Sequence, residues 1–281
     1  MKQRLEATNT DLALQDNLAL KEDISQLARQ LFGSKVKKRV GFTSWLWDTY
    51  TKAQGNDFLL IHNPGGWGCT LLSDCLEWEK SVVEGVRATI ERLGHTWVLT
   101  QYFRSGHNWW THVRDVKKEA RFFLTGKSRG AEVMAAELRF ITQHLSNLKV
   151  ILIGASQGAA FGNAVMRHLS DTKQVYSIEL GIFFPQMKRR AITERTLAVD
   201  GNGQMRDPMC HRDLWVGFKA YIAAPYRWVK YRLQGKPQKF TYCINAPGHD
   251  YSWEYPEVQR QIIDFLNLNF GTKSNVEVEV P

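Results

Sequence analysis

Two patterns of apolar and polar residues alternate along this chain. Short runs rich in apolar residues are typical of strands that a parallel sheet buries on both faces, and they lie at 58–61, 97–102, 150–154, 175–184, 196–199 and 240–245. Between several of these runs, as in 76–93 and after the last run in 255–269, apolar residues recur at the spacing of an amphipathic helix. This order predicts an α/β fold, with a mostly parallel central sheet flanked by helices.

The first forty residues predict a helical leader ahead of a main domain at 41–281. Gly33 is a typical helix stop, and the apolar positions before it share one helix face: Leu20, Ile24, Leu27 and Leu31, within a helix predicted at 11–32. Charges interrupt the first twenty residues, so they do not resemble a secretory signal. No run approaches the ~18 apolar residues that cross a bilayer, and we expect a cytoplasmic protein.

The composition indicates an ordinary globular core and a strong positive charge. Of the 281 residues, 43% are hydrophobic and 23% are charged, which is usual for a globular domain. The four cysteines include no C-x-x-C pair of the kind that zinc sites and disulfide scaffolds show. We therefore expect free thiols, no metal and no other cofactor. The formal net charge is +9.

The most informative segment begins at the predicted strand 150–154. Gly154-Ala155-Ser156-Gln157-Gly158 matches the pattern G-x-S-x-G and leads at once into a helix rich in small residues. A serine on a sharp strand-to-helix turn needs neighbours without bulky side chains, and Gly154, Ala155 and Gly158 meet that need. The pattern predicts that Ser156 is a nucleophile. A tight turn with an incidental serine is the alternative.

Because of this strand, turn and helix, residues 55–270 resemble the α/β-hydrolase superfamily of serine hydrolases. That family orders its catalytic residues as serine, acid and histidine. His249 lies in the sequence APGHDYSWEYP, after the last predicted strand and before the terminal helix, where the family has its histidine. The resemblance implies that His249 takes the Ser156 proton and returns it to the leaving group. It also implies that His62 is a structural histidine ahead of the oxyanion turn.

The resemblance places the catalytic acid after the strand at 196–199. Asp207 lies at the later position that the family favours, and Asp200 comes directly off the strand before a Gly-Asn-Gly turn. We predict that Asp207 orients His249. Asp200 is the alternative acid, and Asp213 or another carboxylate remains a further candidate.

Two backbone N–H groups are expected to hold the oxyanion. One belongs to Gln157, the residue after the nucleophile, and the other comes from the N-P-G-G-W-G turn at 63–68. Pro64 has no N–H, so the second donor is predicted to be Gly66 or Trp67. The turn is similar to the N-P-G-G turn of some hydrolases close to the proline iminopeptidases. A phosphate-binding loop is the rival interpretation, but no G-K-[S/T] follows.

A basic insertion separates Asp207 from the last predicted strand. Residues 206–239 hold eight basic and two acidic residues, and Pro225 interrupts their apolar stripe. We therefore predict a pair of short helices at about 208–238 that cover the site. Their cationic side is either simply solvated or lies on an anionic membrane surface, which would make the protein peripheral at the membrane. Nucleic acid is the less favoured partner, because no nucleic-acid motif accompanies the charge.

Together these features predict a serine hydrolase that cleaves a carboxylic ester or related acyl bond through an acyl-enzyme intermediate. Four tryptophans near the expected pocket favour an apolar acyl or aromatic substrate group, although packing explains each equally well: Trp67, Trp109, Trp110 and Trp253. The turn at 63–66 keeps an aminopeptidase or amidase open. A catalytically silent binding protein of the same fold is the non-enzyme alternative. The sequence indicates neither the substrate nor the oligomeric state.

Overall fold

The computed structural model describes residues 2–105, 118, 120–122, 124–211, 214–235, 243 and 246–271. The chain divides into two compact units, Met1–Gly55 and Asn56–Pro281. The boundary therefore follows Gly55, whereas the sequence placed it after residue 40. The predicted strand at 240–245 lies outside the described residues except for Cys243.

The first unit is a helical hairpin. α1 (Lys2–Phe32) ends where Gly33 adopts a φ of 54°, a conformation that glycine reaches without strain. α2 (Val36–Ala53) then returns, and the rings of Phe32 and Phe42 meet edge to face at 5.4 Å. The predicted leader helix is present but begins earlier than residue 11. α2 was not predicted from the sequence, since its buried face includes Thr49 as well as apolar residues.

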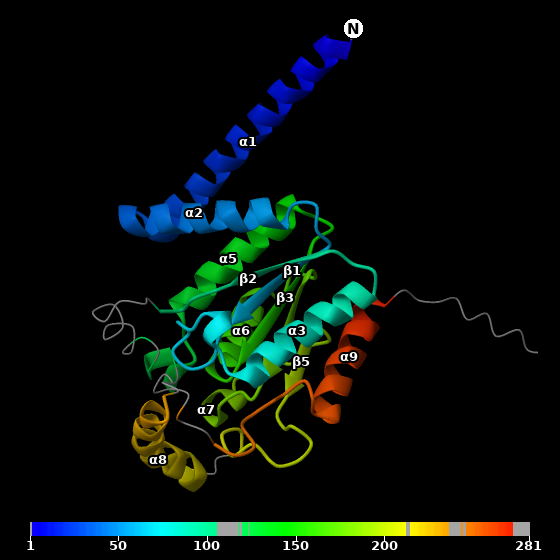
Figure 1. The fold of residues 1–281 in the computed structure, drawn as a ribbon. Coiled ribbons are helices and arrows are strands. Elements are labelled where there is room, and N and C mark those ends of the chain that lie inside the picture. Colours follow the sequence, from blue (N-terminus) through cyan, green and yellow to red (C-terminus); the bar gives the residue numbers. More distant parts are fainter. Residues whose placement is uncertain are drawn as a thin grey trace, which may run out of the picture. The chain divides into compact units, whose positions relative to one another are not determined.

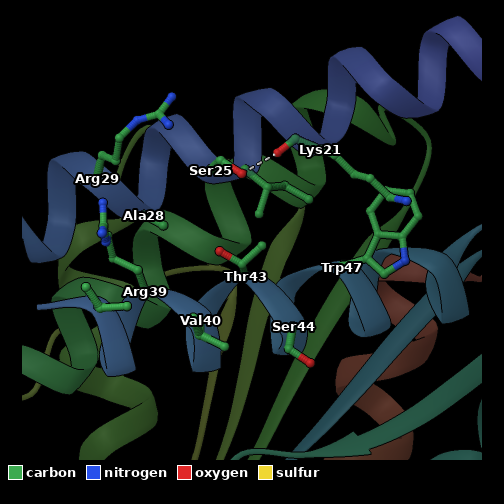
Figure 2. Close-up of a pocket in the computed structure, with 11 residues that line it drawn as sticks. Lys21, Ser25, Ala28, Arg29, Arg39, Val40, Thr43, Ser44 and Trp47 are labelled. Atoms are coloured by element: carbon green, nitrogen blue, oxygen red, sulfur yellow. Dashed lines mark hydrogen bonds between the residues drawn. The ribbon is translucent and has the colours of Figure 1, made fainter.

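An open pocket of about 580 Å³ lies between α1 and α2 (Figure 2). Ile24 and Ala28 contribute buried apolar surface to it, and the Lys21 ammonium lies over the Trp47 ring, 4.7 Å from its centroid. Arg29 and other cations also line the pocket. Apolar side chains thus join the two helices of the hairpin, and cationic side chains lie beside them.

The second unit is built on a five-stranded, all-parallel sheet (Figure 1). The strands are β1 (Phe58–Asn63), β2 (Trp97–Gln101), β3 (Lys149–Ala155), β4 (Val175–Leu180) and β5 (Thr196–Val199). They lie in the order β2-β1-β3-β4-β5. This doubly wound order changes direction between β1 and β3, and such sheets bind ligands beyond the carboxyl ends of their strands at that point.

Helices flank the sheet, as the alternating pattern predicted. α3 (Glu77–Arg92) and α9 (Pro256–Phe270) pack on one another and share a core with the strands. α6 (Gln157–His168) packs on β1, β3 and β4, and α5 (Arg129–His144) packs on α6. The second unit is therefore an α/β fold.

Three further helices follow strands along the chain: η1 (Leu72–Asp74) after β1, α7 (Phe184–Met187) after β4 and the longer α8 (Leu214–Leu233) after β5. β4 ends at Leu180, earlier than predicted, because Gly181 turns the chain with a φ of 61°. Of the helices that the structure describes, none combines the length and the apolar character needed to cross a membrane.

The prediction of two short helices in the basic insertion is wrong. α8 continues through Pro225 as one helix of 20 residues. A proline inside a helix removes one backbone hydrogen bond and often bends the helix rather than ending it. Pro225 is exposed, so water can form a hydrogen bond with the backbone group that loses its partner.

Candidate active site

Ser156 forms the turn between β3 and α6, and its backbone is strained. Its φ is 55° and its ψ is −113°. Among the described residues it is the only one other than glycine with a positive φ. Such conformations cost about 1–3 kcal/mol and persist where the surrounding structure imposes them. Here the Ser156 N–H donates to the Leu180 carbonyl of β4, 2.7 Å away, which holds the turn against the sheet.

Both glycines of the G-x-S-x-G pattern are required by close packing. A Cβ on Gly154 would lie 2.6 Å from backbone atoms of Gly158 and Ala159. A Cβ on Gly158 would lie 2.1 Å from the carbonyl oxygen of Asn63, at the end of β1. Gly154 therefore allows α6 to turn back tightly on β3, and Gly158 allows α6 to touch β1. A need for small residues was predicted from the sharp turn alone, and the contact with β1 is a second reason at Gly158.

Asp207 and His249 form a hydrogen-bonded pair. The Asp207 carboxylate is fully buried, and its Oδ2 lies 2.7 Å from His249 Nδ1. Burial raises the pKa of Asp207, but the hydrogen bond and charge of His249, with further donors, outweigh burial and hold that pKa below its ordinary value. An ionised carboxylate only accepts, so Nδ1 carries the proton and Nε2 is left as an acceptor.

Three more donors converge on the Asp207 carboxylate. Oδ2 accepts from the Tyr251 hydroxyl and from the Cys210 thiol at 3.2 Å, and Oδ1 accepts from the Met209 N–H at 2.7 Å. Burial raises the pKa of both Tyr251 and Cys210, so both stay protonated. These partners were not predicted, because nothing in the sequence shows which side of each loop faces the acid.

Asp200, the alternative acid, has a different partner. Both its carboxylate oxygens accept from Arg190 Nη1, at 2.6 and 2.7 Å, and Arg190 Nε donates to Glu179 Oε2 at 2.7 Å. Arg190 is thereby enclosed between two carboxylates, with a side chain only 2% exposed. Asp200 serves as one half of an ion pair that fixes the segment between β4 and β5. The third candidate, Asp213, lies outside the described residues.

The structure brings the three predicted catalytic residues to one edge of the sheet. Ser156 follows the last residue of β3 and is bonded to Leu180 of β4. The His249 ring packs on Phe183, just beyond β4, with ring centroids 5.7 Å apart. Asp207 follows β5 along the chain and is bonded to His249. This is the carboxyl edge, where doubly wound sheets hold their ligands.

The predicted oxyanion turn lies against the Ser156 turn. A Cβ on Gly65 would lie 3.4 Å from the Ala155 carbonyl oxygen, so the two turns are in contact. The Gly68 N–H donates to the Gly65 carbonyl at 3.2 Å and closes the turn. The Gly65 N–H donates to Glu79 Oε1 at 3.0 Å. The Gly65 N–H is thus engaged, and the assignment of Gly66 or Trp67 as the donor stays a prediction.

Arg104 and Ser105 hold the carbonyl groups of the oxyanion turn. Arg104 donates to the Pro64 carbonyl at 2.8 Å and to the Gly66 carbonyl at 2.6 Å, and the Ser105 hydroxyl donates to the Trp67 carbonyl at 2.7 Å. The C=O and N–H of one trans peptide point in opposite directions. The Trp67 N–H therefore points away from Arg104. No sequence signal marked Arg104 for this role, because it follows β2, far along the chain from the turn.

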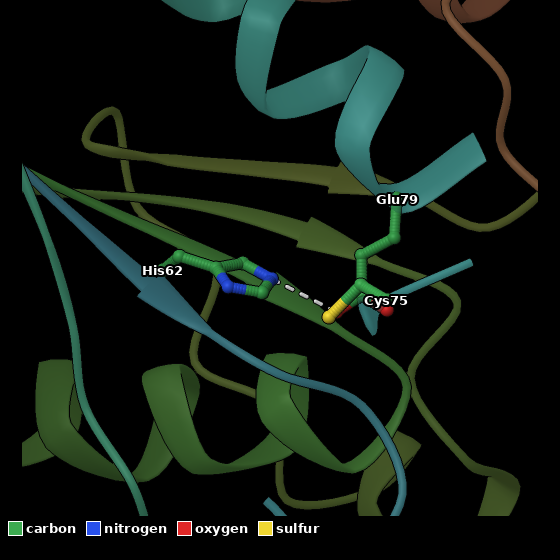
Figure 3. A group of neighbouring side chains, drawn as sticks. All are labelled: His62, Cys75 and Glu79. Carbon is green, nitrogen blue, oxygen red and sulfur yellow. Dashed lines mark hydrogen bonds and ion pairs between the residues drawn. The ribbon is translucent and has the colours of Figure 1, made fainter. Parts of the chain in front are cut away.

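A buried network connects the oxyanion turn to α3, and Figure 3 shows two of its members, His62 and Glu79, together with Cys75. His62 Nε2 lies 2.9 Å from Glu79 Oε1, the same oxygen that accepts from Gly65, and His62 Nδ1 lies 3.0 Å from Gln101 Nε2. Gln101 Oε1 accepts from the Leu72 N–H, so its amide nitrogen donates to His62. Nε2 must then carry the His62 proton and donate to Glu79. His62 is thus structural, as the resemblance implied.

Among the residues that the structure describes, one group has the composition of a metal site. His62, Cys75 and Glu79 each place a ligand atom within 4.8 Å of the others. Both ring nitrogens of His62 are already engaged in hydrogen bonds, and Glu79 Oε1 already accepts two. These hydrogen bonds account for the positions of His62 and Glu79 without an ion.

The tryptophans expected near the pocket fall in different places. Trp253 packs on α3, where a Cβ on Gly85 would lie 2.1 Å from its ring. It belongs to the core rather than to a pocket, since it lies against the buried cluster between α3, α9 and the sheet. Trp109 and Trp110 lie outside the described residues. Trp67 remains in the oxyanion turn.

No protein-family model and no curated protein matches this sequence. The geometry of the carboxyl edge is therefore the basis for assigning a function.

Proposed function

We propose that this protein is a serine hydrolase of the α/β-hydrolase type, cleaving a carboxylic ester or related acyl bond. The observation that carries the proposal is that the strained Ser156 and the buried Asp207, hydrogen-bonded to His249, lie at the same carboxyl edge of the sheet. Serine hydrolases of this type present their nucleophile on a strained strand-to-helix turn. They use a histidine oriented by an ionised aspartate as the base.

In the proposed reaction, His249 Nε2 takes the proton of Ser156 Oγ as Oγ bonds to the acyl carbon. Asp207 stabilises the imidazolium that forms, and the N–H of Gln157 with that of Gly66 or Trp67 holds the oxyanion. The bond to the alcohol oxygen then breaks, and His249 returns the proton to that oxygen. Water attacks the acyl-enzyme by the same steps and releases the acid and free Ser156.

The test is covalent labelling with a fluorophosphonate probe, followed by identification of the labelled peptide. We expect labelling at Ser156 in the wild type and none in Ser156→Ala. Ser170→Ala, which removes an exposed serine beyond the end of α6, is the matched control and should label normally. Circular dichroism checks that each variant folds. Labelling of Ser156→Ala at the wild-type level would overturn the proposal.

A substrate panel then distinguishes the bond that is cleaved. p-Nitrophenyl esters of increasing acyl length are compared with aminoacyl anilides. Turnover of the esters supports the proposed activity, whereas turnover of the anilides alone would favour the aminopeptidase alternative. A protein that the probe labels at Ser156 but that hydrolyses neither panel would have a reactive serine, and its substrate would not be the proposed one.

A further inference from the structure

The outer face of α8 is apolar. Five large apolar side chains are between 49% and 83% exposed: Trp215, Ile222, Tyr226, Val229 and Leu233. They are separated by seven, four, three and four residues, a spacing that places them along one face of a helix. Contiguous exposed apolar surface on a globular protein marks an interaction site.

The opposite side of α8 faces the protein. Ala224 lies two residues from both Ile222 and Tyr226, which puts it on the other side of the helix, and it is fully buried. Where the structure describes the side chains of α8, the small Ala224 thus lies inward and the five large apolar residues lie outward.

Cations accompany the apolar stripe, and acids do not. α8 contains four basic residues and no aspartate or glutamate. Lys219, Lys230 and Arg232 are all exposed. The Lys219 ammonium lies 5.1 Å from the Trp215 ring centroid, and the Arg232 guanidinium lies 4.1 Å from that of Trp228. Positive charge therefore lies directly beside the exposed aromatic and apolar surface.

We infer that α8 lies in the surface of an anionic lipid bilayer, with its apolar stripe among the acyl chains and its cations at the headgroups. Helices that bind in this way combine a large apolar face with lysine and arginine, and anionic headgroups attract each cation. The absence of acids on α8 complements such a surface. A polynucleotide would leave the five apolar side chains in water.

The insertion that carries α8 begins and ends at the candidate active site. It leaves the sheet edge after Asp207 and returns before His249, and these two residues are bonded at 2.7 Å. Because both ends of the insertion join the candidate active site, a membrane-bound α8 favours a lipid-like ester as substrate. The substrate assignment rests on the proposed function, whereas the membrane binding does not.

The test is co-sedimentation of the full chain with phosphatidylcholine vesicles that contain an increasing share of phosphatidylserine, at low and high salt. We expect binding that rises with phosphatidylserine and falls with salt, because salt screens the headgroup charge. Replacing Lys219, Lys230 and Arg232 by Gln should lower the partition coefficient roughly a hundredfold. Ile222→Gln with Leu233→Gln should lower it by about tenfold or more.

Matched controls distinguish binding through α8 from non-specific binding by cations or apolar residues elsewhere on the protein. Ile192→Gln with Leu268→Gln removes two equally exposed apolar residues elsewhere, and Lys127, Lys173 and Lys188 changed to Gln remove three cations elsewhere. Both should bind as the wild type does. Ser156→Ala should also bind normally, so a failure of the proposed chemistry leaves this result intact.

Three outcomes would overturn the inference. The first is a wild-type chain that sediments with no vesicle, or equally with neutral and anionic vesicles. The second is unchanged binding after the α8 substitutions. The third is sedimentation velocity showing a dimer that the Ile222 and Leu233 substitutions dissociate, since a second copy of the chain would then cover the stripe.

Discussion

The strain at Ser156 can be tested without any knowledge of the reaction. Glycine adopts a φ of 55° freely, whereas alanine and serine do not. We expect Ser156→Gly to be more stable than Ser156→Ala by about 1–3 kcal/mol, the usual cost of such a conformation. Urea unfolding of the two variants measures the difference. If Ser156→Gly were the less stable, the turn would not be strained in solution, and a main support for a nucleophile there would be lost.

Asp207 and Asp200 bind different partners, so we expect their substitutions to have different effects. Asp207→Asn should lower kcat roughly 10⁴-fold, because an amide beside Nδ1 favours the wrong tautomer of His249. Asp200→Asn should leave kcat near wild type and destabilise the fold by about 1–3 kcal/mol, since it leaves Arg190 with one carboxylate instead of two. Ester turnover and thermal unfolding of both variants check this. Equal losses of kcat would contradict it.

Glu79 is expected to act on catalysis only through the position of the oxyanion turn. Glu79→Ala removes the acceptor of both Gly65 and His62, so we expect the rate of probe inactivation to fall by up to about 10²–10³, the effect of one lost oxyanion donor. Glu79→Gln keeps an oxygen at that position and should largely restore the rate. Glu77→Ala, exposed on the same helix, is the control. The same rate in the Ala and Gln variants of Glu79 would contradict the positioning role.

At the scale of elements, the sequence predicted most of the features that depend on local packing. The strands β1, β3 and β5 are mostly apolar, and Gly154 and Gly158 indicate a close approach of the backbone, where a Cβ would lie only 2.1–2.6 Å from neighbouring backbone atoms. Both features are local, so a pattern along the chain can reveal them. α9 was predictable for the same reason.

The features that the sequence could not reveal depend on contacts between distant segments. Arg104 reaches the Pro64 carbonyl across 40 residues, and Tyr251 reaches Asp207 across 44. The prediction for α8 failed for a different reason, because Pro225 lies inside one continuous helix instead of dividing it into two. Periodicity fixes which residues share a face, and only tertiary packing decides whether that face is covered.

At the scale of the whole molecule, two buried carboxyl groups make stability depend on pH in opposite directions. The pKa of Asp207 is lowered, so its contribution is present above its unfolded pKa of about 4 and is lost as the pH falls through the folded value. Glu137 on α5 is nearly fully buried, and its Oε2 has no hydrogen-bond partner among the described residues. Burial raises the pKa of Glu137 well above its usual value. Between its unfolded and folded pKa values only the unfolded state is ionised, so stability falls as the pH rises.

Glu137→Gln should therefore stabilise the protein increasingly with rising pH. Below pH ~4 both states of the wild type are protonated at this position, and the offset between variant and wild type should be constant. Above pH ~4, the free energy of unfolding of the wild type falls by up to about 1.4 kcal/mol per pH unit until the folded pKa is reached. The variant lacks this carboxyl, so its free energy of unfolding does not fall in this way. Thermal unfolding from acid to mildly alkaline pH measures the growing difference in Tm. Glu132→Gln, at an exposed position of the same helix, provides the control, and a difference in Tm that stays flat for Glu137→Gln would show that this carboxyl is ionised and solvated in the folded protein.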